Sequence, residues 1–232
     1  MKWRQGSAIC ALLVSLSSVI AAQDGTAITP RTVQLSPSLP NDPVKIVKVM
    51  LDGTEVKPGM QAWPADKPGV PFQGGDDWYN HLTVVLKNIS PKKIVCGGVN
   101  VIFLGLGDGT PNHPMVGEQT SVGQRPEHGQ YSGITGRKLE EPPRDAILVE
   151  PGQEFRVQAV SPDRLEGVKE TIESRQPVPS IASIRVGLST VYFEDGTKWA
   201  ANLYYRPDFR AKGKYVVISR KEFDNYGQEA SQ

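Results

Sequence analysis

The stretch Leu82-Thr-Val-Val-Leu-Lys-Asn-Ile-Ser-Pro-Lys-Lys-Ile94 decides the fold class. Its first half places apolar residues at every second position, the spacing of a strand with one buried face. A short polar turn that contains proline follows, and a second β-rich run begins where it ends. Because the connection is short and polar, we expect Trp78–Asn88 and Ile94–Leu104 to pair as a hairpin.

Further strand signals lie on both sides of this stretch, separated by turn residues. The Glu194-Asp-Gly-Thr197 segment is a hairpin turn of the Asp-Gly type. The additional predicted strands are Val44–Leu51, Ala146–Val149, Glu154–Val160, Ile181–Phe193, Lys198–Tyr205 and Lys214–Ser219.

One helix is predicted beside these strands. Ser161-Pro162-Asp163 offers an N-cap, a proline at the first helical position and an acid in the first turn. Leu165, Val168 and Ile172 follow at the spacing of an apolar helical stripe. The chain is therefore predicted to be mainly β: an immunoglobulin-like antiparallel two-sheet sandwich with one short peripheral helix. An open barrel is the alternative architecture.

The sequence predicts one domain over residues 44–219. Residues 105–144 have almost no apolar periodicity and many glycines and prolines, which predicts a long loop insertion. Residues 23–43 are polar and aperiodic, typical of a flexible leader, and residues 220–232 form a polar tail.

The N-terminus has the pattern of a secretory signal peptide. Lys2 and Arg4 precede an uncharged apolar run, Ala8–Ala22, that ends in small residues. The run is short and rich in Ser and Ala for a membrane span, which needs about 20 strongly apolar residues. Residues 1–22 are therefore predicted to be removed on export, to the periplasm or outside the cell. A retained N-terminal anchor is the alternative.

Charge and cysteine content narrow the function classes. The chain has 26 basic and 25 acidic residues, and loss of Lys2 and Arg4 would leave 24 against 25. This near-neutral balance argues against binding to nucleic acid or to an anionic membrane surface in general. Cys96 would be alone in the mature chain, so no intramolecular disulfide is expected. Cys10 lies inside the apolar run and does not fit a lipoprotein signal.

Two motifs resemble those of a known group of proteins. The Leu82–Ile94 stretch is similar to a valine-rich strand followed by Lys-Asn-x-Ser in exported bacterial immunoglobulin-like modules of the FxLYD type. Val191-Tyr-Phe-Glu-Asp-Gly-Thr-Lys-Trp199 looks like a second recurring hairpin of uncharacterised exported bacterial proteins. The resemblance implies a β-sandwich and carries over no catalytic residue.

Two apparent catalytic motifs fail in their own context. Ser90-Pro-Lys-Lys93 matches the Ser-x-x-Lys of penicillin-recognising enzymes, which requires a helix start, whereas this segment is predicted to be a turn. Gly105-Leu-Gly-Asp-Gly109 follows a strand but does not open into a helix, as a phosphate-binding loop would.

Isolated reactive side chains have ordinary explanations. His113 and His128, with Asp108 and Glu127 nearby, are too far apart in sequence for a typical zinc pair, so solvated loop residues are expected. Cys96 lies in an apolar strand, where a buried inert thiol is expected. We therefore predict no catalytic residue, no cofactor-binding residue, no metal ligand and no cofactor.

Two surfaces are candidates for binding, although core packing and a solvated charged face are the favoured explanations. The first is an aromatic platform of Trp63, Trp78, Trp199, Tyr204 and Tyr205, and the second is a basic cluster of Arg206, Arg210, Lys212, Lys214, Arg220 and Lys221 around Tyr215.

The first functional hypothesis is an exported, non-enzymatic binding or scaffolding module for an unknown envelope protein or polysaccharide, with no nucleic acid and no membrane span after cleavage. The second is an exported hydrolase or metal-dependent enzyme with a site in the 105–144 insertion, around Asp108, His113 and His128. The third is a structural subunit that pairs exposed strand edges with another chain.

Overall fold

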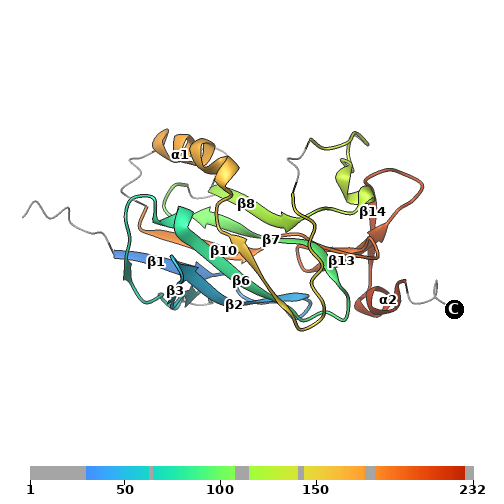
Figure 1. Ribbon diagram of the computed structural model, residues 1–232, viewed down its shortest axis with the longest axis horizontal. Coiled ribbons are helices and arrows are strands. Elements are labelled where there is room, and N and C mark those ends of the chain that lie inside the picture. The colour runs from blue at the N-terminus through green and yellow to red at the C-terminus, as the bar shows by residue number, and fades with distance from the viewer. Residues whose placement is uncertain (1–29, 63–64, 108–114, 141–143, 176–180, 228–232) are drawn as a thin grey trace, which may run out of the picture.

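The computed structural model describes residues 30–62, 65–107, 115–140, 144–175 and 181–227 (Figure 1). The predicted signal peptide and the candidates Trp63, Asp108 and His113 lie outside the described residues. Within them the chain is mainly β, with one sheet of ten strands, one of four strands and two α-helices, which confirms the mainly-β prediction.

The larger sheet contains β1 (Pro30–Leu35), β4 (Gly59–Met60), β5 (Phe72–Gln73), β7 (Ile94–Phe103), β8 (Val116–Gly123), β10 (Ser183–Leu188), β11 (Val191–Phe193), β12 (Lys198–Ala200), β13 (Leu203–Pro207) and β14 (Tyr215–Ile218). The smaller sheet contains β2 (Val44–Leu51), β3 (Thr54–Val56), β6 (Leu82–Asn88) and β9 (Glu154–Gln158). The helices are α1 (Leu165–Glu173) and α2 (Arg220–Asn225), with short 3-10 turns η1 (Trp78–His81), η2 (Glu127–Gln130) and η3 (Pro162–Arg164).

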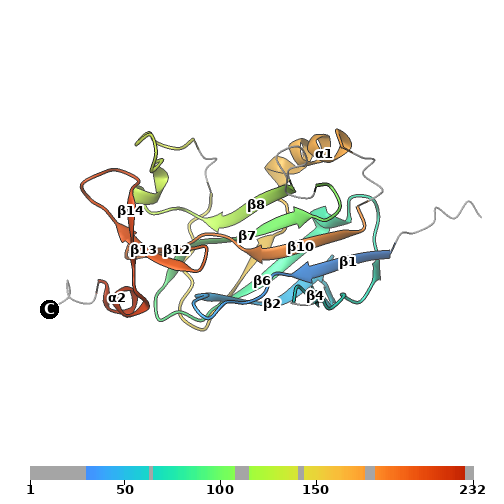
Figure 2. The same ribbon diagram turned by 180° about the vertical axis from the view of Figure 1, so that it is seen from behind.

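The two sheets form two layers with the core between them. The four-stranded sheet lies in front of the larger one in Figure 1, and the order is reversed in Figure 2. Leu82, Val84 and Leu86 of β6 are fully buried, as the period-2 pattern predicts, and they join Val99 and Val101 of β7 in one hydrophobic cluster. Burial of each such side chain contributes about 1.5–3 kcal/mol.

The predicted hairpin between β6 and β7 is wrong. β6 pairs with β2 and β9, whereas β7 pairs with β8 on one edge and with β10 and β11 on the other. The connection is a corner between sheets, built on the buried Asn88 side chain. Its Nδ2 donates to the carbonyls of Lys92 (2.8 Å) and Val149 (3.0 Å), and its Oδ1 accepts from the Ser90 amide and hydroxyl.

The predicted leader is corrected in its second half. Residues 30–35 form β1, which pairs in parallel with β10 and with β4. The prediction of a purely antiparallel sandwich is therefore wrong for these pairs. Val33 is buried opposite Ile184 of β10, so this strand contributes to the core. The polar composition of residues 23–43 does not predict this.

The predicted loop insertion and polar tail also contain regular structure. Residues 116–123 form β8, which pairs along most of β7 although few of its residues are apolar. The tail contains α2, begun by a capping box between Ser219 and Glu222 and held by the buried ring of Phe223. Phe223 stacks on Tyr204 at 4.2 Å between ring centroids.

Other boundaries are confirmed or shifted by a few residues. The strands predicted at Val44–Leu51, Glu154–Val160 and Lys214–Ser219, the helix stripe of Val168 and Ile172, and the hairpin of β11 and β12 are confirmed. Trp78–His81 forms a 3-10 turn instead of strand, and of Ala146–Val149 only Val149 makes a β-bridge, to Ile94.

The larger sheet divides along one edge of β7. β10 pairs with Val99–Phe103 and β11 pairs with Ile94 and Cys96, so the predicted Ile181–Phe193 strand is interrupted at Ser189 and Thr190. One branch continues from β10 to β1, and the other continues from β11 through β12 to β14. This sheet fork leaves a gap between the loop that follows β1 and the turn that joins β12 to β13.

Candidate functional site

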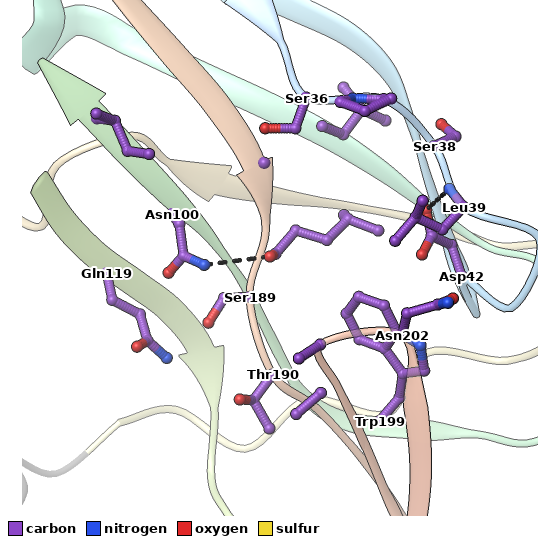
Figure 3. Close-up of a pocket in the computed structure, with 17 residues that line it drawn as sticks. Ser36, Ser38, Leu39, Asp42, Asn100, Gln119, Ser189, Thr190, Trp199 and Asn202 are labelled. Atoms are coloured by element: carbon purple, nitrogen blue, oxygen red, sulfur yellow. Dashed lines mark hydrogen bonds between the residues drawn. The ribbon is translucent and has the colours of Figure 1, made fainter. Parts of the chain in front are cut away.

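A pocket of about 410 Å³ lies at the sheet fork, and we refer to it as the fork pocket (Figure 3). The loop after β1 forms one wall, the β12–β13 turn forms another, and residues of β2, β7, β8 and β10 complete it. The volume is in the range of small-molecule sites. The lining residues are Ser36, Pro37, Ser38, Leu39, Asp42, Ile46, Asn100, Ile102, Gln119, Gly187, Leu188, Ser189, Thr190, Trp199, Ala200, Ala201 and Asn202.

Buried polar atoms without partners concentrate in this pocket. Among the described residues, seven buried side-chain nitrogen or oxygen atoms have no hydrogen-bond partner. Four of them belong to the lining: Asp42 Oδ1, Ser189 Oγ, Trp199 Nε1 and Asn202 Oδ1. Asp42, Ser189 and Trp199 are only 8%, 4% and 4% exposed. Because buried polar groups are almost always hydrogen-bonded, these four atoms indicate a site for a polar ligand or ordered water.

The electrostatics of the fork pocket depend on a single charged lining residue. Asp42 Oδ2 accepts a hydrogen bond from the Leu39 amide at 2.7 Å, which leaves Oδ1 for another donor. Burial raises the pKa of the Asp42 carboxyl, and the bond from Leu39 opposes this in part. The lining has no lysine, arginine or histidine, so the pocket favours neutral or cationic ligands over anions.

Amide and hydroxyl groups supply the remaining polarity. Asn100 and Gln119 lie opposite each other on β7 and β8, and Asn202 lies in the β12–β13 turn. In Figure 3, Asp42, Trp199 and Asn202 are grouped beside the loop that follows β1, whereas Asn100 and Gln119 lie near β8. Asn100 Nδ2 donates to the Leu188 carbonyl at 3.2 Å.

Both walls are held by the surrounding fold. The Ser36 amide donates to the Val186 carbonyl at 2.8 Å, which fixes the start of the loop after β1. Tyr204 Oη donates to the Asn41 carbonyl at 2.7 Å, which fixes its end. In the opposite wall, Ala201 and Asn202 both have positive φ, 49° and 65°, as a tight two-residue hairpin turn requires.

Of the candidate metal ligands, the structure describes Glu127 and His128. His128 lies in η2, where its Nε2 is 2.6 Å from the Lys214 carbonyl oxygen and its ring contacts Phe209 and Tyr215. Glu127 is exposed beside it, while Asp108 and His113 lie outside the described residues. No group of three or more His, Cys, Asp or Glu that could hold a metal ion occurs among the residues with a described placement.

The rejected catalytic motifs have structural roles. Ser90 is buried in the corner after β6, where its hydroxyl donates to Asn88 Oδ1 at 2.7 Å, so the Ser-x-x-Lys segment is the predicted turn. Gly105 has a φ of +87° in the turn that ends β7. Cys96 is buried in β7, as predicted for an inert thiol.

The predicted aromatic platform is not an exposed surface where it is described. Trp78, Trp199 and Tyr204 are all buried, which confirms for them the core packing that the sequence favours over a binding platform, and Tyr205 is half-buried. The basic cluster is divided between two elements. Arg210 pairs with Asp208 in the β13–β14 loop, and Arg220 pairs with Asp224 on α2.

Sequence reasoning missed Asp42, Ser189 and Asn202 as site residues. Each lies in a turn or a break between strands, where a polar residue is the ordinary expectation and carries no signal. For Trp199 the sequence suggests a role only for the face of the ring, whereas the indole nitrogen is the unpartnered atom.

Within the described segments, no helix combines the length and apolar character needed to span a membrane. Comparison with known proteins found no matching family model, no matching curated protein and no matching solved structure.

Proposed function

We propose that this protein is an exported, non-enzymatic binding module whose fork pocket holds a neutral, hydroxyl-rich ligand of the saccharide class. The observation that carries the proposal is the set of four buried, unpartnered polar atoms on residues that line the pocket. Asp42 Oδ1 and Asn202 Oδ1 accept hydrogen bonds, Trp199 Nε1 donates, and Ser189 Oγ does both. A ligand that satisfies all four must present both donors and acceptors, which sugar hydroxyls provide.

The composition of the lining supports a saccharide over other ligands. Leu39, Ile46, Leu188 and the Trp199 ring contribute apolar surface for the C–H faces of a sugar, alongside amides and hydroxyls for its edges. An anionic ligand would meet the Asp42 carboxylate with no basic lining residue to compensate.

The same lining favours binding over catalysis. Glycoside hydrolysis ordinarily uses two carboxyl groups on either side of the scissile bond. Asp42 is the only carboxylate among the pocket residues, all of which are described, and they include no histidine, cysteine or lysine. The support for export is the signal-peptide pattern of residues 1–22, which would place the module where envelope polysaccharides are available.

An immunoglobulin-like affiliation belongs to this proposal. Its support is the pair of facing sheets and the β11–β12 hairpin, which carries one of the two motifs similar to FxLYD-type modules. The parallel pairing of β1 departs from a simple module of that kind and places the loop that carries Asp42 at the fork.

The test is isothermal titration calorimetry, which measures the affinity for a panel of neutral, acidic and basic saccharides chosen after a glycan-array screen. We expect a neutral saccharide to bind, and Asp42→Asn to weaken it roughly 10- to 100-fold, because a hydrogen bond to a charged group is worth roughly 1.5–3 kcal/mol. Trp199→Phe keeps an aromatic ring and removes the indole donor, so it should weaken binding less, by roughly fivefold.

The matched control is Asp145→Asn, which removes an exposed carboxylate far along the chain from the pocket residues and should leave the affinity unchanged. Failure of every neutral saccharide to bind, or equal affinity in wild type, Asp42→Asn and Trp199→Phe, would contradict the proposal.

A further inference from the structure

Two loops lie at the β14 end of the molecule (Figures 1 and 2), and none of their residues lines the fork pocket. We call them the tip loops. The first, Tyr131–Lys138, is closed by a β-bridge between its two end residues. The second, Asp208–Lys214, joins β13 to β14 and is closed by a hydrogen bond from the Asp208 amide to the Lys214 carbonyl.

The tip loops pack against each other. Lys212 Nζ lies 4.9 Å from the centre of the Tyr131 ring, and the Lys214 carbonyl is 2.6 Å from His128 Nε2, just before the first loop. A side chain on Gly213 would meet the Tyr131 carbonyl at 2.5 Å, which shows how closely the two backbones approach. The two loops therefore act as one surface.

Each loop exposes one large apolar side chain. Ile134 is 96% exposed and Phe209 is 77% exposed, the highest values among the large hydrophobic residues of the described chain. Burial of these two side chains by a partner would be favourable, and their position on adjoining loops makes the tip loops a candidate interaction surface.

The surface is also strongly basic. The two loops contain Arg137, Lys138, Arg210, Lys212 and Lys214 against Asp208 alone, a net charge of +4, whereas the whole chain has +1. The one acid is held by Arg210 at 3.0 Å. The nearest acids of the first loop, Glu127 and Glu140, lie beyond the bridge that closes it.

We propose that the tip loops dock the domain on an anionic lipid surface, with Ile134 and Phe209 entering the interface and the basic side chains meeting the headgroups. Exposed apolar tips surrounded by Lys and Arg provide both contributions to peripheral membrane binding: apolar burial and electrostatic attraction. A soluble anionic polymer would use the charges but would leave both apolar side chains in water. The near-neutral net charge of the whole chain is compatible with this proposal, because the basic charge is concentrated in two short loops.

The first experiment is co-flotation with vesicles of phosphatidylcholine alone and with about one third phosphatidylglycerol. The full chain and a form that begins at Gln23 are compared, because Ala8–Ala22 is itself apolar, and every described strand and helix lies within residues 30–227. We expect both forms to prefer the phosphatidylglycerol vesicles and to lose this preference in about 1 M salt. A preference seen only in the full chain, or in neither form, overturns the proposal.

The charge contribution is tested with Arg137→Glu/Lys138→Glu/Lys214→Glu. Each basic residue near an anionic bilayer contributes about fivefold in partition coefficient, so this variant should bind at least about 100-fold more weakly. The control reverses three exposed lysines elsewhere, Lys45→Glu/Lys48→Glu/Lys57→Glu, with the same change in net charge. Equal losses in the two variants would show a general charge effect and contradict a tip-loop site.

Insertion is tested with Ile134→Trp and Phe209→Trp against Val70→Trp, which places an indole at an exposed apolar position outside the tip loops. Brominated lipids should quench the added fluorescence of the first two variants and not of the third. Binding to dextran sulfate as tight as to the vesicles, with no added quenching at 134 or 209, would identify an anionic polymer as the partner and overturn the lipid proposal.

Discussion

Tyr204 Oη lies between two partners, accepting a hydrogen bond from Arg220 Nη1 at 2.6 Å and donating one to the Asn41 carbonyl at 2.7 Å. Asn41 immediately precedes Asp42, so this hydroxyl connects β13 and α2 to one wall of the fork pocket. Burial raises the pKa of Tyr204, which keeps the hydroxyl protonated as a donor. The C-terminal helix, which the sequence assigns to a loose tail, thereby supports the candidate site.

Tyr204→Phe should therefore weaken both the fold and ligand binding. The ring keeps its stacking on Phe223, and the loss of the hydroxyl lowers the free energy of unfolding by about 1 kcal/mol. The loop before Asp42 loses its tether, so saccharide affinity should fall several-fold. Urea unfolding and titration calorimetry measure the two effects. Tyr205→Phe is the control, and an equal loss of affinity in both variants would argue against the tether.

The β12–β13 turn predicts a stabilising substitution. Ala201 has a φ of 49°, a conformation that costs a residue with a Cβ about 1 kcal/mol and costs glycine almost nothing. Ala201→Gly should raise the free energy of unfolding by about 0.5–1 kcal/mol. Ala201→Val should lower it by at least about 1 kcal/mol, because β-branched residues are the least tolerant of positive φ. Thermal unfolding that ranks the three proteins in any other order would contradict the turn geometry.

The same turn shows what local sequence patterns reveal. Alternation predicts strands well, because burial on one sheet face sets the pattern, as for the apolar residues of β6. The Asp195-Gly196 turn is also predictable, because Asp-Gly is a hairpin signal. In the structure Gly196 has the positive φ, 81°, that such a turn requires. The Ala201-Asn202 turn lacks this signal, and the sequence therefore predicts one strand, Lys198–Tyr205, where the structure has two.

Strand pairing and the fork pocket depend on contacts between distant segments, which local patterns do not encode. β1 lies in a polar stretch, and Val33 becomes a core residue only because β10 supplies a parallel neighbour 151 positions later along the chain. Asp42, Ser189 and Asn202 line one pocket because the larger sheet divides at β7. The basic cluster of the sequence contains Arg210, Lys212 and Lys214, but only the fold places Arg137 and Lys138 on a neighbouring loop.

The corner that replaces the expected hairpin predicts a large effect for one buried amide. Asn88→Ala removes two donated and two accepted hydrogen bonds and leaves the Val149 carbonyl without the bond from Nδ2. The free energy of unfolding should fall by about 2–4 kcal/mol. Asn100→Ala is the matched control, because its exposed amide donates only one bond at 3.2 Å, and it should cost less than about 1 kcal/mol. Similar losses in the two variants would contradict the corner.

The raised pKa of Asp42 predicts a pH dependence of stability with a definite sign. In the window between the ordinary carboxyl pKa and the raised value, the native state holds more protons than the unfolded state, so stability falls as pH increases. The free energy of unfolding of Asp42→Asn minus that of wild type, measured by urea unfolding at several pH values, should increase through this window and then level off. Asp163→Asn should show the opposite trend, because a hydrogen bond from Ser161 lowers the pKa of Asp163.

The same carboxyl connects pH to ligand binding. A saccharide hydroxyl that donates to Asp42 Oδ1 stabilises the ionised form, so bound ligand should lower the Asp42 pKa and affinity should rise as pH increases through the window. Calorimetric titrations from about pH 4 to pH 7 measure this slope, with Asp42→Asn as the variant that should lack it. An affinity that is flat with pH in wild type, or that changes equally in Asp42→Asn, would mean that the ligand does not contact this carboxylate.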